Sequence, residues 1–221
     1  MSEKIFQKIQ KEVQKELSCS AHDMDHILRV YNLSIHLSEN ESVDIEVVKA
    51  SALLHDIAKA REHADTTGKI DHAILSAEMS YPILKKLNFP SSKINHIQNC
   101  ITSHRYRSGG KPQTMEAKIL FDSDKLDLTG AIGVVRCFAL AGKFGQQLCN
   151  FDSHDYTNIS GKIDGKIKDK SKHTPQIEFE TKIKLLMDKL YTEKARKICK
   201  ERIEFFEKFL KRLEQESKGI L

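Results

Sequence analysis

The chain has 221 residues, of which 39% are hydrophobic and 30% are charged, which is normal for a soluble globular protein. Its net charge of +5 suits attraction to anionic substrates, but the basic residues are too scattered for a dedicated nucleic-acid-binding protein. Because it contains only four prolines and ten glycines, long helices are favoured over short strands and tight turns.

Two features of the sequence predict a cytoplasmic protein with no membrane partner. The five cysteines form no CxxC pair and no regular framework, which is typical of reduced thiols in the cytosol. The N-terminal segment MSEKIFQKIQKEV is charged and amphipathic, and no apolar run approaches the roughly 20 residues of a membrane span.

Apolar residues recur with helical spacing along most of the chain. Ile5, Ile9, Val13 and Leu17, for example, follow one another at steps of four and define one helical stripe. The same periodicity, together with turn and cap residues, predicts helices over 3–17, 24–37, 45–59, 71–87, from Pro90 to about 104, over 116–128, and up to about 143.

The remaining third of the chain is less regular. Residues 144–175 are rich in Gly, Asp, Ser and Lys without clear periodicity, which predicts a long loop or flap. A helical pair is expected over 176–218, with Thr192 as the cap between its two helices. The sequence therefore predicts a single all-α domain over 1–221, an irregular helical bundle with its core over 20–143.

Four polar residues interrupt the apolar faces of three predicted helices. His26 shares a face with Val30, the doublet His55-Asp56 follows an apolar face, and Asp124 lies four residues after Leu120. Burying carboxylates without a compensating cation is costly. A divalent metal explains the set more economically than separate core histidines and ion pairs, and such ligands suit Mn, Fe, Co, Ni, Mg or Zn.

The segments that carry these residues resemble a known family. AHDMDHILRVYNLS, ASALLHDIAKA and ILFDSDKLDLTGAIGVVR are similar to the HD superfamily of metal-dependent phosphohydrolases, and most similar to its stand-alone bacterial and archaeal proteins of about this length. The resemblance extends over nearly the whole chain, including the C-terminal helical pair. It implies that His26, His55, Asp56 and Asp124 hold the metal.

The resemblance also implies roles for five further residues. His72 and His104 match histidines that hold a second metal in some members and contact substrate phosphate in others, so one or two ions are expected. Lys59 and Arg136 match basic residues that bind the substrate anion, and Asp127 is a candidate outer-sphere carboxylate and proton acceptor. The alternatives for these residues are helix caps and solvated surface charges.

The implied function is metal-dependent hydrolysis of a phosphoester in a nucleotide or related small metabolite, by an enzyme that acts alone or as a homo-oligomer. No G-x-x-x-x-G-K-[ST] motif is present, which disfavours an NTP-driven motor. Two alternatives stay open: a two-iron HD oxygenase, and a metal-dependent sensor or binding module without turnover.

Overall fold

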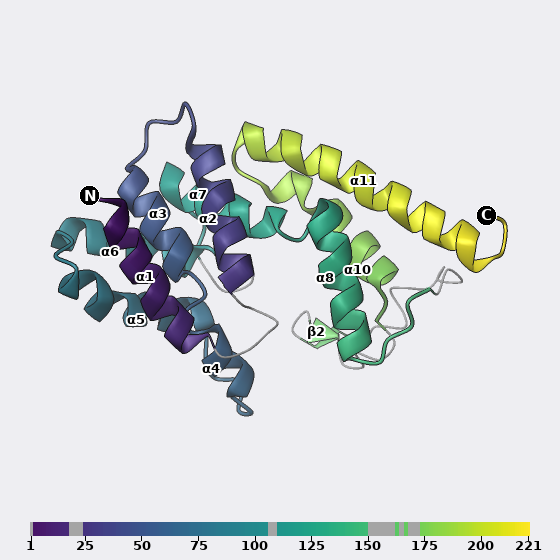
Figure 1. The fold of residues 1–221 in the computed structure, drawn as a ribbon, viewed down its shortest axis with the longest axis horizontal. Coiled ribbons are helices and arrows are strands. Elements are labelled where there is room, and N and C mark those ends of the chain that lie inside the picture. The colour runs from purple at the N-terminus through teal and green to yellow at the C-terminus, as the bar shows by residue number, and fades with distance from the viewer. Residues whose placement is uncertain (1, 18–23, 106–109, 150–161, 164–165, 168–172) are drawn as a thin grey trace. The chain divides into compact units, whose positions relative to one another are not determined.

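The structure is a computed structural model of the chain. It describes residues 2–17, 24–105, 110–149, 162–163, 166–167 and 173–221 (Figure 1). Their contacts divide the chain into two compact units, Met1–Asp124 and Lys125–Leu221. The boundary falls inside a helix, and the predicted extent of the core over 20–143 stays a prediction.

The first unit is built from helices alone among its described residues. These are α1 (Glu3–Glu16), α2 (Met24–Ser38), α3 (Ile45–Leu54), α4 (Lys59–Ala64), α5 (His72–Lys86), α6 (Ser91–Ser103) and most of α7 (Met115–Leu126). Side-chain caps fix two of the starts: Asp44 accepts a hydrogen bond from the backbone N–H of Glu46 at the start of α3, and Asp71 accepts one from Ala73 at the start of α5.

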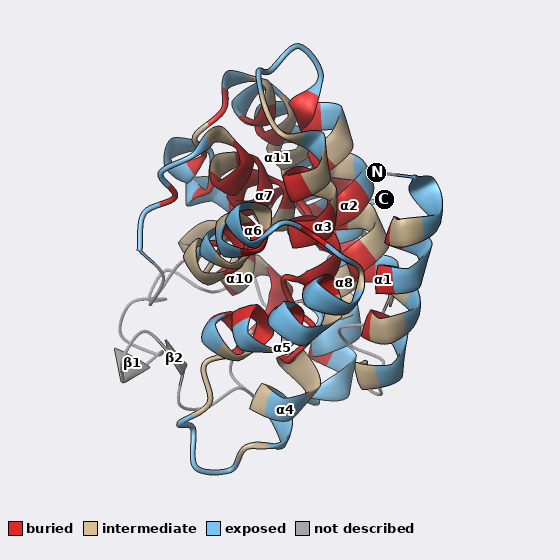
Figure 2. Ribbon diagram, turned by 90° about the vertical axis from the view of Figure 1, so that its left-hand side faces the viewer, coloured by how far each residue is buried: buried red, intermediate tan, exposed pale blue. Residues whose placement is uncertain are grey.

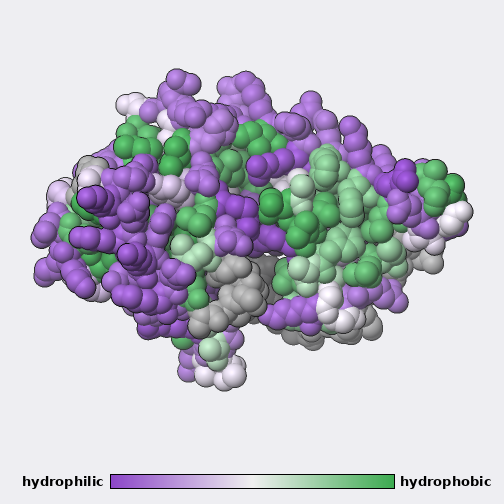
Figure 3. Space-filling view, in the orientation of Figure 1, coloured by the Kyte–Doolittle hydropathy of each residue, from purple (hydrophilic) through white to green (hydrophobic). Residues whose placement is uncertain are grey.

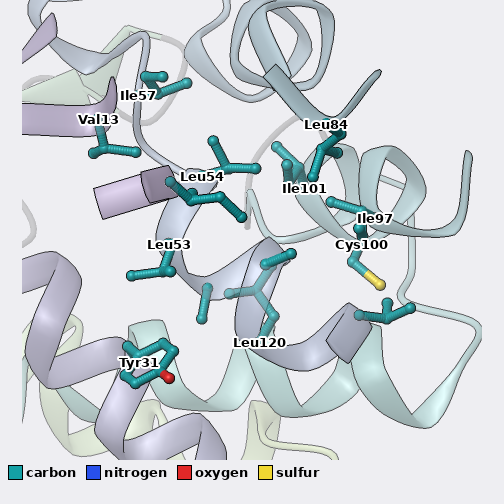
Figure 4. Close-up of a cluster of buried hydrophobic side chains, with 14 of the residues drawn as sticks. Val13, Tyr31, Leu53, Leu54, Ile57, Leu84, Ile97, Cys100, Ile101 and Leu120 are labelled. Carbon is teal, nitrogen blue, oxygen red and sulfur yellow. The ribbon is translucent and has the colours of Figure 1, made fainter. Parts of the chain in front are cut away.

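Helix α3 is the central element of the first unit. It packs against α1, α2 and α6, and Figure 2 shows it almost wholly buried, whereas α1 and α5 each present an exposed face. The apolar side chains around it form one core (Figure 4), whose labelled members are Val13, Tyr31, Leu53, Leu54, Ile57, Leu84, Ile97, Cys100, Ile101 and Leu120. This core fixes the helices whose ends carry the candidate site.

The second unit combines helices with a minimal hairpin. It contains the end of α7, α8 (Gly130–Lys143), β1 (Lys162–Ile163), β2 (Lys166–Ile167), α10 (Pro175–Thr181), the short 3₁₀ segments η2 (Ile183–Leu185) and η3 (Met187–Lys189), and α11 (Glu193–Ser217). β1 and β2 are antiparallel, with Lys162 opposite Ile167. Helix α11 packs against α8.

The predicted all-α fold is confirmed, since β1 and β2 are the only strands among the described residues. Three boundaries differ from those expected. The helix predicted over 45–59 ends at Leu54, the one predicted to 128 ends at Leu126, and the first helix of the C-terminal pair is broken after Thr181. Thr192 does cap α11, through a hydrogen bond from the N–H of Ala195.

The described residues bear only in part on three further expectations, which concern the loop over 144–175, the cysteines and the membrane. The loop or flap over 144–175 lies largely outside the described residues. Among the described residues, Cys100, Cys137, Cys149 and Cys199 form no disulfide bond, and Cys19 lies outside the described residues. None of the described helices combines the length and the apolar character that crossing a bilayer requires.

The second unit exposes several large apolar side chains. On α8, Val135 is 66% exposed and Ile132 and Leu140 are each 38% exposed. Figure 3 shows hydrophobic residues gathered on the visible surface of the second unit.

Candidate metal centre

The first histidine of the site lies in the opening turn of α2. His26 is buried, with 3% of its surface exposed, on a helix whose buried face also includes Val30 and Leu37. Apolar packing on the same face therefore holds the imidazole inside the first unit.

The doublet His55-Asp56 lies in the turn that separates α3 from α4. Hydrogen bonds from Ile57 N–H to the Leu54 carbonyl and from Lys59 N–H to the Asp56 carbonyl tighten the chain into 3₁₀-like turns here. Both side chains are buried, His55 at 0% and Asp56 at 5% exposure. The break in the helix brings two consecutive polar side chains to one interior place.

Three residues form a first group able to hold a metal ion: His26, His55 and Asp124. His26 Nε2 lies 3.3 Å from His55 Nε2 and 3.5 Å from Asp124 Oδ1. Asp124 comes from α7 and is the most exposed of the three, with 18% of its side chain accessible. The group thus joins a helix start, an interhelical turn and a third helix.

A second group consists of Asp56, His72 and His104. Asp56 Oδ1 lies 3.3 Å from His72 Nε2 and 3.5 Å from His104 Nε2, and the two imidazole nitrogens are 3.3 Å apart. His72 is the first residue of α5, and His104 directly follows α6. All three side chains are buried.

Asp56 lies between the two groups. Its Oδ1 faces the second group, while its Oδ2 lies 3.8 Å from His26 Nε2 and 3.9 Å from His55 Nε2. A carboxylate with one oxygen toward each of two ligand groups is the arrangement of a bridging ligand.

Backbone carbonyls fix the orientation of two of the imidazoles. His55 Nδ1 lies 2.8 Å from the carbonyl oxygen of Ala52, and His104 Nδ1 lies 2.5 Å from that of Ile101. Since a carbonyl only accepts, each Nδ1 carries the hydrogen, and in the neutral ring Nε2 then presents a lone pair. Burial lowers the pKa of His55 to about 4, which keeps its ring neutral near pH 7.

The facing nitrogen and oxygen atoms of these residues are better explained as metal ligands than as hydrogen-bond partners of one another. Burial opposes ionisation of Asp56, but His55, His104 and Lys59 hold the pKa of its carboxyl well below the ordinary value. Asp56 Oδ1 nevertheless accepts no hydrogen bond from the part of the chain that the structure describes. Imidazole lone pairs and carboxylate oxygens that face each other at these separations repel unless a cation lies between them.

Known proteins place the chain in a family. Residues 23–129, which include both groups, match the model of the HD domain. An uncharacterised protein of Methanocaldococcus jannaschii, MJ0778, is 31% identical over 123 residues, which cover 49% of this chain and 68% of MJ0778. The chain belongs to the HD domain family.

Two HD relatives resemble it over most of their length. YpgQ of Bacillus subtilis, an uncharacterised protein, is 28% identical over 205 residues, 91% of this chain and 87% of YpgQ. Its crystal structure in complex with ADP gives a TM-score of 0.73 at 26% identity and covers 98% of this chain and 97% of YpgQ. A structure described as a predicted HD superfamily hydrolase, from an uncultured Thermotogales bacterium, gives 0.64 at 26% identity over 96% and 91%.

The expectations about the HD site can now be compared with the geometry. The structure brings together all six residues expected to hold one or two ions, and it divides them into two groups of three around Asp56. The family supports the hydrolase class.

Lys59 lies at the edge of the second group. It is the first residue of α4 rather than the end of α3, and its Nζ lies 3.1 Å from both Glu62 Oε2 and His72 Nδ1. Glu62 was not singled out from the sequence, where it stands among charged residues of a short segment and looks like part of a solvated face. Its i, i+3 spacing from Lys59 was the only available signal.

Asp127 and Arg136 belong to the second unit and contact each other. Asp127 is 3% exposed, and its carboxylate accepts a hydrogen bond from Arg136, whose guanidinium also lies 3.4 Å from the Asp127 carbonyl oxygen. Asp127 directly follows the end of α7, so it is not part of the helix that carries Asp124. The anion-binding role of Arg136 and the proton-accepting role of Asp127 stay predictions.

Proposed function

We propose that this HD protein is a metal-dependent phosphohydrolase that cleaves a phosphoester of a nucleotide or a related small metabolite. The observation that carries the proposal is the position of the Asp56 carboxylate, with one oxygen toward His26 and His55 and the other toward His72 and His104. Carboxylate-bridged pairs of divalent ions are suited to displacement at phosphorus.

His26, His55 and Asp124 would hold one ion, His72 and His104 the other, and Asp56 both. When bound, such ions polarise a phosphoryl oxygen and lower the pKa of water, so that a nucleophile is available near neutral pH. The residues of the chain supply the rest. The carbonyls of Ala52 and Ile101 keep His55 and His104 oriented, and burial keeps the ligand atoms out of bulk water.

Lys59 is the residue best placed to act on the substrate. Its ammonium lies beside the second group, and only 16% of its side chain is exposed. A lysine in such a position neutralises charge on the phosphoryl oxygens and stabilises the additional charge of the transition state. The nucleotide class is supported by the ADP bound to YpgQ, the relative of similar length.

The direct test is to load the metal-free protein separately with Mn²⁺, Co²⁺, Ni²⁺, Zn²⁺ and Mg²⁺ and to measure phosphate release. The panel should include nucleoside mono-, di- and triphosphates, cyclic nucleotides and p-nitrophenyl phosphate. Hydrolysis of at least one nucleotide, lost when the metal is removed and restored when it returns, is expected. A metal-loaded protein that hydrolyses none of them would favour the sensor or binding module.

The two complete groups also favour a second candidate, the two-iron oxygenase. That reaction requires an iron at each group, and Asp56, His72 and His104 would hold the second one. Oxygen consumption by the iron-loaded protein in the presence of phosphonates or polyols separates the two candidates, because hydrolysis consumes no oxygen.

A further inference from the structure

Glu62 contacts three cationic or hydrogen-donating side chains around the second group. Its Oε2 lies 3.0 Å from His72 Nδ1 and 3.1 Å from Lys59 Nζ, and its Oε1 lies 3.2 Å from Arg105 Nη1. Burial opposes ionisation of Glu62, but His72 and Lys59 hold the pKa of its carboxyl below the ordinary value. The side chain is 18% exposed, so it is largely removed from competing water.

Arg105 contacts both Glu62 and Asp71, the residue that caps the start of the helix carrying His72. The same guanidinium nitrogen that contacts Glu62 lies 2.7 Å from Asp71 Oδ2. Asp71 is the N-cap of α5 and accepts a hydrogen bond from Ala73 N–H, and His72 is the first residue of that helix. Glu62 is therefore held at a fixed position relative to the backbone of His72.

The hydrogen bond to Glu62 selects one of two tautomers of His72. A carboxylate only accepts, so His72 Nδ1 carries the hydrogen and Nε2 presents its lone pair to the second group, 3.3 Å from Asp56 Oδ1. Lys59 Nζ lies 3.1 Å from the same Nδ1 and would act in the opposite direction. If Lys59 donated to Nδ1, the hydrogen would move to Nε2 and block that nitrogen as a ligand.

We propose that Glu62 is a positioning residue that completes the second metal group by holding His72 in its Nδ1-protonated tautomer and drawing the Lys59 ammonium onto its own carboxylate. The inference rests on the proposed function only in assuming that a second ion binds. Glu62, on α4, is not itself a metal ligand, but it controls whether the second ion binds.

The test compares wild-type protein with Glu62→Gln and Glu62→Ala at the level of metal binding. Metal-free protein is titrated with Mn²⁺ alone, and the bound ions per chain are counted by elemental analysis after equilibrium dialysis. Wild type is expected to bind two ions. In both variants the first ion should bind as in wild type, and the second about 10–100-fold more weakly, the usual effect of losing an outer-sphere partner.

Nitrogen-15 NMR of the histidine side chains gives an independent readout in the metal-free protein. The His72 signals, assigned by their loss in His72→Asn, should show a protonated Nδ1 in wild type and a shift toward a protonated Nε2 in Glu62→Ala, which has no acceptor for the Nδ1 hydrogen. A merely structural role for Glu62 would not change the tautomer of one histidine.

Glu16→Gln is the matched control. Glu16 forms an exposed ion pair with Arg61, which is also on α4, at 2.8 Å. This variant should bind two ions and keep the wild-type tautomer. The inference is overturned if Glu62→Ala binds both ions as tightly as wild type, if the His72 tautomer is unchanged in Glu62→Ala, or if wild type binds only one ion. Absence of phosphoester hydrolysis with two ions bound would instead count against the proposed function alone.

Discussion

Asp56 Oδ1 lies 3.3 Å from His72 Nε2 inside the first unit, although both atoms are acceptors when His72 is hydrogen-bonded to Glu62. The other oxygen of the same carboxylate faces His26 and His55. Because Asp56 serves both groups, its removal should have a different consequence from the removal of a residue that serves one.

We expect Asp56→Ala to lose both metal ions and His104→Ala to lose only the ion of the second group. The protein should stay folded in each case, because Asp56 is a buried charge that the metal-free protein must accommodate. Elemental analysis gives the ions per chain, and circular dichroism checks the fold. Retention of one ion by Asp56→Ala would mean that the carboxylate does not bridge.

Lys59→Met should keep both ions and lower phosphoester turnover. Its methylene stem is preserved, and the hydrogen bond between Glu62 and His72 does not depend on the ammonium. Loss of one charge-stabilising contact of this kind reduces kcat about 10–1000-fold, or roughly 1.4–4 kcal/mol. Lys15→Met, which removes an exposed partner of Glu12, is the control and should be as active as wild type. Equal rates for the two variants would place the substrate elsewhere.

Asp65→Asn should lower the stability of the first unit at pH 7 and much less at pH 2. Asp65 accepts hydrogen bonds from the Thr67 hydroxyl at 2.6 Å and from the N–H groups of Thr67 and Ile70 at 2.8 Å, which lower its pKa from 3.8 to about 2. A depressed folded-state pKa stabilises the protein above the unfolded-state pKa, and this contribution is lost as the pH falls from about 3.8 to about 2.

Urea denaturation of both proteins between pH 7 and pH 2 measures this difference. The gap in unfolding free energy between wild type and Asp65→Asn should narrow across that window. A gap of constant size would show that the carboxylate contributes through its shape and not through its charge.

Two glycines of α8 should respond oppositely to alanine. A Cβ at Gly133 would lie 2.2 Å from the Leu128 carbonyl oxygen and 3.3 Å from the Phe206 ring, whereas a Cβ at Gly142 would meet nothing within 4 Å. Gly133→Ala should therefore lower the unfolding free energy by about 1–3 kcal/mol through overpacking. Gly142→Ala should raise it by up to about 0.5–1 kcal/mol, because alanine loses less backbone entropy in a helix. Thermal melts of the two variants would contradict this if both shifted in one direction.

The sequence was most informative where one helical face carries both apolar and polar residues. His26 was predicted to point inward from the spacing of its apolar neighbours, and it is buried. The end of α3 could not be predicted in the same way. Ile57 and Ala58 are as buried as the helix before them, so the apolar pattern continues through the turn that separates α3 from α4.

Contacts between charged residues were the least predictable feature. Nothing in the periodicity of the chain pairs Glu62 with His72 and Arg105, because these contacts join α4 to the start of α5 and to the residue beyond His104. Arg136 was singled out by its match to the family and Asp127 by its position close to Asp124, but their pairing with each other depends on how the turn after α7 meets α8. Tertiary geometry decides both arrangements.

The six candidate ligands begin with His26, in the second helix, and end with Asp124, the last residue of the first unit. An ion held by residues so far apart in the sequence would act as a reversible cross-link between distant parts of the unit. Because the unfolded chain does not hold these ligands together, the ion would bind the folded unit preferentially. Free metal would then further stabilise the folded unit and lengthen its lifetime against proteases, in addition to supporting its chemistry. A metal-starved cell would hold this protein not as an idle enzyme but as a shorter-lived one.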